Sequence, residues 1–188
     1  MKPSSLFAVS LLVATALAAT SAVASHERFH KATKDSKDGF FAATDPTYVK
    51  ECGSCHFAYS PGLLPARSWN LHMERLEKHF GEVVTLQPAT RDTIKRYLVE
   101  NAADVSPYEG SQYFMARIKA DATPYRFVEV PLYREMHRII QEVISIKTKV
   151  KVRTLTNCNA CHQFATEGSF ATSEMYVPGL TPPVRTAR

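Results

Sequence analysis

Cys52-Gly53-Ser54-Cys55-His56 and Cys158-Asn159-Ala160-Cys161-His162 are two copies of the pattern Cys-x-x-Cys-His, and together they use all four cysteines of the chain. This pattern is the attachment signature of c-type haem. Two thiols one helical turn apart can each bond to a vinyl group of one porphyrin, and the adjacent imidazole then takes an axial position on the iron. The two copies therefore predict two covalent haem c groups, with His56 and His162 as the proximal iron ligands.

Three other uses of the four cysteines stay open from spacing alone. They could bind one zinc ion together, but the two pairs are about a hundred residues apart, and a zinc module has no use for the His after each pair. A redox-active Cys-x-x-Cys usually lies in an alternating strand and helix pattern, which neither pair has. A disulfide within each pair is the third alternative. Two complete motifs with no cysteine left over favour haem.

The N-terminus has the pattern of an export signal. Lys2 precedes an apolar stretch, and Ala22-Val23-Ala24 follows that stretch. A short basic region, an apolar core and an A-x-A site are typical of a secretory signal peptide. The sequence therefore predicts that residues 1–24 are a signal peptide, cleaved after Ala24, and that residues 25–188 are one soluble periplasmic domain. The alternative is an uncleaved membrane anchor, for which the apolar stretch is short. Export agrees with the motifs, because bacteria attach c-type haem outside the cytoplasm.

The charge pattern does not indicate a nucleic-acid-binding protein. The formal net charge is +5, and each ferric haem would add about −1, from two propionates against one residual positive charge. Lys and Arg are scattered, except for an alternating run at Lys147, Lys149, Lys151 and Arg153. We expect that run to be a solvated edge, and docking to an acidic partner is the alternative.

Hydrophobic periodicity and capping patterns predict a mainly α protein, a single small multi-helix domain with extensive loops. The predicted helices are one from Pro46 into the first motif, residues 67–80 with Gly81 as C-cap, one after Pro88, one opened by a capping box at residues 106–109, and residues 132–144. The second motif is expected to start a short helix that ends at Gly168. Residues 25–44 are expected to be loosely ordered, and residues 169–188 to form an irregular tail.

The sixth ligand of each iron has to come from another histidine or from a methionine. Outside the motifs and the signal, the candidates are His26, His30, His72, His79, His137, Met73, Met115, Met136 and Met175. Met73 and Met136 fall on apolar helical stripes, so we expect them to fill the core. Met175 follows the second motif closely and is the methionine kept as an alternative ligand.

Among the histidines, His79 and His137 have the most favourable surroundings. His79 lies beside Gly81, where the backbone can turn away and admit a planar macrocycle. His137 shares a predicted helical face with Tyr133, and an imidazole buried there needs a partner such as iron. His72 and His79 are seven residues apart on one predicted helix, which is about 10 Å along its axis. One haem is therefore not expected to reach both.

Three blocks of sequence resemble the bacterial dihaem cytochrome c family. They are Glu51–His56 continuing through Ala58–Trp69, then His79-Phe80-Gly81-Glu82 with Leu86, Pro88-Ala89-Thr90 and Tyr97-Leu98, and Asn157–His162 with Gly168, Phe170 and Val177-Pro178. Members are small, mostly helical electron-transfer proteins whose two haems each have two histidine ligands. The resemblance implies that His79 and His137 are the distal ligands. The pairs His56 with His79 and His162 with His137 are favoured, and the exchanged pairing stays open.

The resemblance also implies redox partners, such as a membrane b-type cytochrome or an oxygen-binding c-type haem protein. With both axial positions filled, neither iron can bind a substrate, so the expected function is electron transfer at low potential and not catalysis. The alternative function is that of a dihaem enzyme or gas-binding protein with one open iron.

Overall fold

The computed structural model describes residues 39–146, 152 and 154–179. These residues form five α-helices and six short 3-10 helices, and within them no strand occurs, only two isolated bridges. The α-helices are α2 (Pro46–Cys52), α3 (Ala66–Glu74), α4 (Pro88–Glu100), α5 (Glu109–Met115) and α6 (Pro131–Ile146). The 3-10 helices are η2 (Pro61–Leu63), η3 (Leu76–Lys78), η4 (Phe127–Glu129), η5 (Cys158–Ala160), η6 (Ala165–Glu167) and η7 (Thr172–Glu174). The predicted mainly α fold is confirmed.

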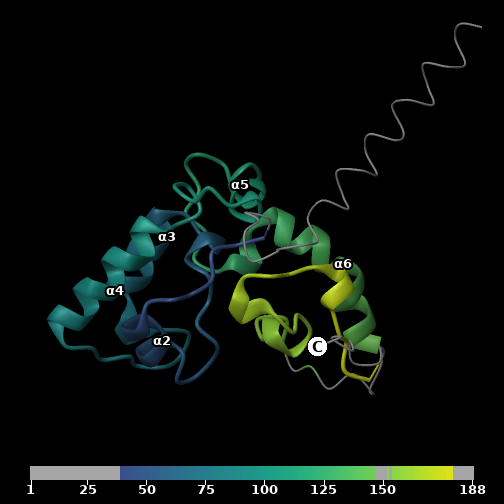
Figure 1. Cartoon of the computed structure of the whole chain (residues 1–188), viewed down its shortest axis with the longest axis horizontal. Coiled ribbons are helices and arrows are strands. Elements are labelled where there is room, and N and C mark those ends of the chain that lie inside the picture. The colour runs from purple at the N-terminus through teal and green to yellow at the C-terminus, as the bar shows by residue number, and fades with distance from the viewer. Residues whose placement is uncertain (1–38, 147–151, 153, 180–188) are drawn as a thin grey trace, which may run out of the picture.

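The two motifs lie in different parts of the molecule (Figure 1). Helices α3 and α4 pack side by side, and α2, which leads into the first motif, packs against α4. The second motif lies beside α6 in the other part, where His162 faces His137. Helix α5 contacts α6 and joins the two parts.

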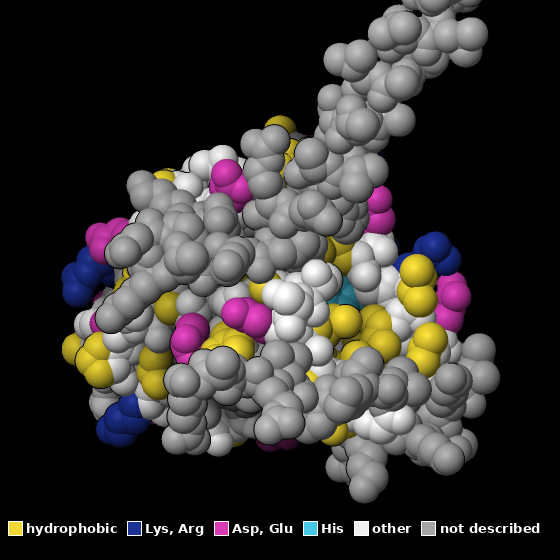
Figure 2. All heavy atoms as spheres, turned by 45° about the vertical axis from the view of Figure 1, so that its right-hand side comes forward, with side chains coloured by type: hydrophobic (Ala, Val, Ile, Leu, Met, Phe, Trp, Pro, Cys, Tyr) yellow, Lys and Arg dark blue, Asp and Glu magenta, His cyan; other side chains and the backbone are white. Residues whose placement is uncertain are grey.

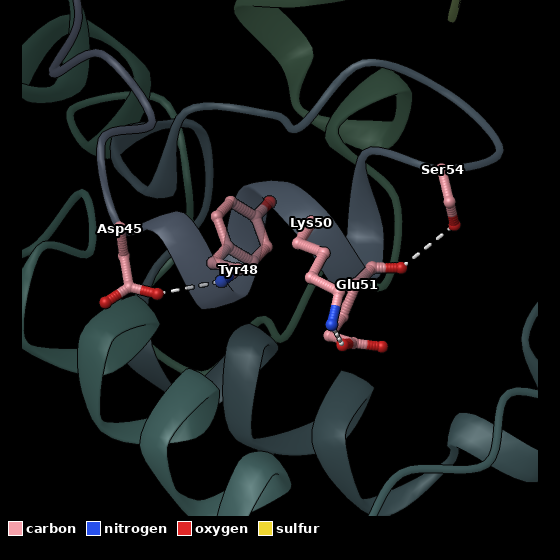
Figure 3. A network of polar contacts seen from close by, with 5 residues as sticks. All are labelled: Asp45, Tyr48, Lys50, Glu51 and Ser54. Carbon is pink, nitrogen blue, oxygen red and sulfur yellow. Dashed lines mark hydrogen bonds and ion pairs between the residues drawn. The ribbon is translucent and has the colours of Figure 1, made fainter.

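Helix α2 forms for the reason that its sequence suggests. Asp45 is the N-cap, and its carboxylate accepts a hydrogen bond of 2.7 Å from the backbone N–H of Tyr48 (Figure 3). Pro46 follows at the first helical position, where its missing N–H costs nothing. Just after the C-terminal end of α2, the Ser54 hydroxyl donates to the Glu51 carbonyl at 3.1 Å. The helix therefore ends at Cys52 and delivers the first thiol of the motif.

The core beside the first motif is built by α3 and α4. Trp69 and Met73 are buried on α3, and they face the fully buried Ile94 and Leu98 of α4. The indole N–H of Trp69 donates to the Pro61 carbonyl at 2.7 Å, so this buried donor is satisfied. The predicted core role of Met73 is confirmed.

The prediction of one helix over residues 67–80 was wrong. Helix α3 ends at Glu74, η3 follows, and the chain then makes a tight turn in which Phe80 and Gly81 both have positive φ, 53° and 101°. His79 and Glu82 exchange backbone hydrogen bonds of 3.0 and 2.9 Å across this turn. The apolar spacing of Leu76 and Phe80 suggested a continuous helix, but left-handed backbone at two successive residues cannot continue one.

Two details of the later helices also differ from the predictions. No capping box forms at residues 106–109: helix α5 begins at Glu109 with Tyr108 as N-cap, and the Ser106 hydroxyl accepts from the Tyr108 N–H at 3.3 Å. In α6, Met136 and Ile139 are 44% and 65% exposed, so Met136 does not fill the core. The buried face of α6 is centred on Tyr133. It is therefore rotated about the helix axis from the predicted stripe, which included Met136 and Ile139.

The first residues of the described region pack against its last part. Phe40 lies in the core, with its ring centre 5.1 Å from that of Phe114 and 5.3 Å from that of Phe170. Its N–H donates to the Gly168 carbonyl at 3.0 Å. Residues 39–44 are therefore packed and not loosely ordered as predicted.

Several sequence expectations concern parts of the chain outside the described residues. The predicted signal peptide (1–24), most of the segment 25–44, the tail beyond residue 179 and all four residues of the basic run lie there. Among the helices of the described region, none combines the length and the apolar character that crossing a bilayer requires.

Candidate haem-binding sites

The structure brings His56 of the first motif next to His79. Their ring centres are 6.3 Å apart, and the two ring planes are inclined by only 22°. Nδ1 of His56 lies 2.8 Å from the Phe57 carbonyl, and Nδ1 of His79 is buried without a hydrogen-bond partner. The turn at Phe80 and Gly81 places His79 here, after α3 has ended.

The second motif brings His162 next to His137 of α6 in the same way. These ring centres are 6.1 Å apart, and the planes are inclined by 70°. Nδ1 of His137 lies 2.9 Å from the Tyr133 carbonyl, and its ring stacks on the Tyr133 ring at 4.0 Å and 17°. Nδ1 of His162 is buried and unpartnered.

Both separations fit two imidazoles on opposite sides of one metal ion. A metal–nitrogen bond is about 2.0–2.1 Å and a ring nitrogen lies about 1.2 Å from the ring centre, so two such rings have centres at most about 6.4–6.6 Å apart, close to the observed 6.3 and 6.1 Å. In His56 and His137 the Nδ1 atom faces a backbone carbonyl, which fixes the tautomer and leaves Nε2 for the metal. The two sites therefore have matching donor sets and different ring orientations.

Burial favours the neutral form of His79, His137 and His162, which is the form that a metal ligand must have. Desolvation, and then the nearby His137, lowers the pKa of His162 to about 4. Desolvation is also the main reason that the pKa values of His79 and His137 are lowered.

The four cysteines occur as two separate pairs. Cys158 is buried, Cys52 and Cys161 are partly buried, and Cys55 is exposed; none is in a disulfide. Burial, and secondarily Glu51, raises the pKa of Cys52 to about 11, and burial raises the pKa of Cys158 to about 12. A redox dithiol needs a lowered thiol pKa, so these surroundings do not suit that alternative.

The zinc alternative requires all four thiols at one point. In the described part of the chain, no group of three or more Cys, His, Asp or Glu side chains is close enough to hold a metal ion. The disulfide alternative likewise has no support, because all four cysteines are free.

His72 is closer to the first site than predicted. Because α3 ends at Glu74, His72 and His79 do not lie on one helix, and their ring centres are 6.1 Å apart instead of being separated along an axis. His72 is buried and stacks on the Tyr125 ring at 4.3 Å and 19°. Desolvation and then His79 lower its pKa to about 4. His26 and His30 lie outside the described residues.

The remaining candidate ligand on the second site is Met175. It forms an isolated antiparallel bridge with His162, and the next residue, Tyr176, donates its N–H to the Cys161 carbonyl at 2.7 Å. Met175 thus packs beside the proximal histidine, whereas His137 lies across from it. Met115 is the last residue of α5.

A cavity of about 790 Å³ opens beside His137, between α6 and residues 154–156. Its lining includes Arg126, Arg134, Arg138 and Glu135 but no residue of the second motif, so the cavity lies beside the proposed haem site, where guanidinium groups can meet carboxylates. In Figure 2, a histidine side chain is visible in a recess among hydrophobic side chains.

Sequence reasoning missed two aromatic residues beside these sites. The Tyr59 ring lies 4.6 Å from the His56 ring, and Phe127 lies 4.7 Å from Tyr59. Burial, and then Cys158, raises the pKa of Tyr59 to about 12. Tyr59 follows the first motif by three residues and was a detectable neighbour, but nothing in the sequence links Phe127 to either motif.

The comparisons with known proteins agree with this geometry. The profile of the family described as "Dihaem cytochrome c" matches residues 48–170, a span that contains both motifs, His79 and His137. The chain belongs to the dihaem cytochrome c family. It is therefore a c-type cytochrome with two covalently bound haem c groups, and a dihaem electron carrier.

Three solved structures of dihaem cytochromes c are similar to this chain. The diheme cytochrome c from Rhodobacter sphaeroides is 37% identical, with 69% of this chain and 99% of that one covered and a TM-score of 0.59. A crystal structure of DHC purified from Rhodobacter sphaeroides gives 37% identity, 69% and 100% coverage and a TM-score of 0.52. A diheme cytochrome type c from Shewanella baltica OS155 is 30% identical, with 71% of this chain and 93% of that one covered and a TM-score of 0.56. A search of the curated proteins found no match.

Proposed function

We propose that each haem of this cytochrome is held by one motif and closed by two histidines. Cys52 and Cys55 form the thioethers of the first haem, and Cys158 and Cys161 those of the second. His56 and His79 would hold the first iron between them. The observation that carries this proposal is the separation of 6.3 Å between their ring centres, which suits one iron between them.

The second iron is proposed to bind His162 and His137, whose ring centres are 6.1 Å apart. The exchanged pairing, which the sequence left open, has no comparable support, because each distal histidine lies next to one proximal histidine. Both irons are then six-coordinate, so substrates have no place to bind. The haems would supply the electron-transfer chemistry, and the function is that of a carrier and not of an enzyme.

The proposed ligands also determine the potentials. Imidazole donates more electron density to iron than a methionine thioether does, so two histidines stabilise the ferric state and give low potentials. Hydrogen bonds from Nδ1 of His56 to the Phe57 carbonyl and from Nδ1 of His137 to the Tyr133 carbonyl increase the basicity of these ligands. Histidine ligation and these hydrogen bonds therefore both lower the potentials.

The cellular setting follows from the sequence. We propose that residues 1–24 are removed after Ala24 and that the protein works in the periplasm, where c-type haem is attached. Its partners are proposed to be redox proteins, with a membrane b-type cytochrome or an oxygen-binding c-type haem protein as the candidates. Purification of the mature protein from a periplasmic extract, with Ser25 as its first residue, would test the export step.

Replacement of the distal ligands tests the coordination. His79→Ala and His137→Ala should each convert one haem from low-spin to high-spin while both haems stay covalently bound. The matched control is His72→Gln, which alters a buried histidine 6.1 Å from His79. It should leave both haems low-spin. If His79→Ala or His137→Ala keeps two low-spin haems, that residue is not a ligand, and if the unaltered protein already has a high-spin haem, an enzyme or gas-binding function becomes the better account.

A further inference from the structure

A continuous series of ring contacts joins the two haem sites. The Tyr59 ring lies 4.6 Å from the His56 ring and 4.7 Å from the Phe127 ring. Phe127 in turn lies 5.5 Å from Tyr133, and Tyr133 lies 4.0 Å from His137. We call Tyr59, Phe127 and Tyr133 the aromatic bridge. It begins at the proposed proximal ligand of the first iron and ends at the proposed distal ligand of the second.

The aromatic bridge is held rigidly at both ends. The Tyr59 hydroxyl donates to the Thr156 carbonyl at 2.8 Å, and the Tyr133 hydroxyl donates to the Leu155 carbonyl at 2.7 Å. These two carbonyls belong to consecutive residues, and only Asn157 separates them from the second motif. The bridge is therefore attached to the same backbone segment that carries the second haem.

The centre of the bridge is also shielded from water. Phe127 is 8% exposed and Tyr133 is 6% exposed, and both belong to the main hydrophobic core. The Tyr59–Phe127 and Phe127–Tyr133 pairs have tilted and edge-to-face planes, the usual geometry of packed aromatic pairs, and the His137 ring stacks on Tyr133.

We propose that the aromatic bridge carries electrons between the two haems. When one iron goes from ferrous to ferric, the other goes from ferric to ferrous, and no bond is made or broken. The tyrosine hydroxyls donate to backbone carbonyls, which cannot accept the proton, so the rings stay neutral and serve as a contact path instead of being oxidised themselves. This inference rests on the proposed function, because it requires His56 and His137 to be iron ligands.

Replacement of the central ring tests the proposal. Phe127→Leu removes one aromatic contact on each side and keeps an apolar side chain of similar volume. The matched control is Phe114→Leu, which removes a phenylalanine of the same core that contacts Phe40 and not the bridge. Phe127→Tyr restores the ring. The full mature holoprotein is used throughout, and the haem-methyl NMR signals are followed at half reduction.

Electron exchange between the haems averages these signals when it is fast and separates them when it is slow. Phe127→Leu should slow the exchange several-fold, while Phe114→Leu and Phe127→Tyr should keep the rate of the unaltered protein. If Phe127→Leu does not fold, Tyr59→Leu breaks the series at its partly buried end and should have the same effect. Unchanged exchange in a folded variant with a broken bridge would overturn the proposal and assign the transfer to direct contact of the haem edges.

This outcome is distinct from a failure of the proposed function. In the latter case the unaltered protein itself would have a high-spin haem, or both haems would stay low-spin in His79→Ala or His137→Ala. Optical spectra of each variant before the NMR measurement separate the two cases.

Discussion

The imidazole planes of His137 and His162 are inclined by 70°, although the ring centres are 6.1 Å apart. Stacking on Tyr133 and the contact of Nδ1 with the Tyr133 carbonyl hold His137 in this orientation. The other pair, His56 and His79, is inclined by only 22°. The two proposed ligand pairs therefore differ in orientation but not in chemistry.

This difference predicts two distinct ferric electron paramagnetic resonance signals. Nearly parallel imidazoles separate the energies of the iron d orbitals and give a rhombic low-spin signal, and nearly perpendicular ones leave two orbitals close in energy and give a signal with a larger maximum g value. We expect one signal of each kind, in equal amounts, from the oxidised protein.

Variants assign the two signals. His137→Ala should remove the signal with the larger g value and leave the rhombic one, whereas His79→Ala should do the reverse. Two rhombic signals in the unaltered protein would be at odds with the 70° inclination.

Gly168 is expected to be essential for the close contact between its own backbone and that of Phe40. Its φ is +82°, and an added Cβ would collide with the Phe40 carbonyl oxygen. We expect Gly168→Ala to lower the free energy of unfolding by roughly 3 kcal/mol, from backbone strain and from displacement of Phe40. Denaturant unfolding of the holoprotein measures this loss.

Gly81→Ala is the matched control for that measurement. Gly81 also has a positive φ, +101°, but no atom lies within 4 Å of its added Cβ. Only the conformational strain remains, about 1–2 kcal/mol. Equal losses in the two variants would show that the Phe40 contact adds nothing.

Because His72 is buried, we expect the free energy of unfolding to fall in weak acid. Its pKa is lowered from 6.5 to about 4, mainly by burial, so the unfolded chain binds a proton there before the folded protein does. The contribution is complete above pH 6.5 and is lost as the pH falls towards 4, at up to about 1.4 kcal/mol per pH unit. Denaturant unfolding at a series of pH values measures the slope.

The variant His72→Gln isolates this effect from acid release of the haem ligands, which both proteins share. It should show a shallower decline in stability between pH 6.5 and 4. A slope equal to that of the unaltered protein would mean that His72 is protonated in the folded state or does not contribute.

The sequence predicted those parts of the structure that depend on local patterns. Asp45 and Pro46 define the start of α2 through a side-chain cap and a fixed φ, and both signals act within one helical turn. The motifs themselves specify their chemistry, because the spacing of two thiols and an imidazole is fixed by the porphyrin. Each of these inferences needed at most six neighbouring residues.

The features that failed depend on distant contacts. The turn after α3 places His79 beside His56, and a helical stripe continuing to Phe80 gave no sign of it. Tyr59 and Thr156 are 97 residues apart, so their hydrogen bond could not be expected from spacing. Likewise, the buried face of α6 is determined by Tyr133, whose hydroxyl reaches Leu155. The spacing of apolar residues alone predicts that the face with Met136 and Ile139 is the buried one.

Addition of carbon monoxide to the reduced mature holoprotein at neutral pH tests the coordination of both irons at once. The gas binds ferrous haem only where an axial position is open or easily vacated. If His56 with His79 and His162 with His137 close the two irons, the optical spectrum of the reduced protein stays unchanged. A shift of the Soret band to that of a carbon monoxide complex, for either haem, would contradict the account.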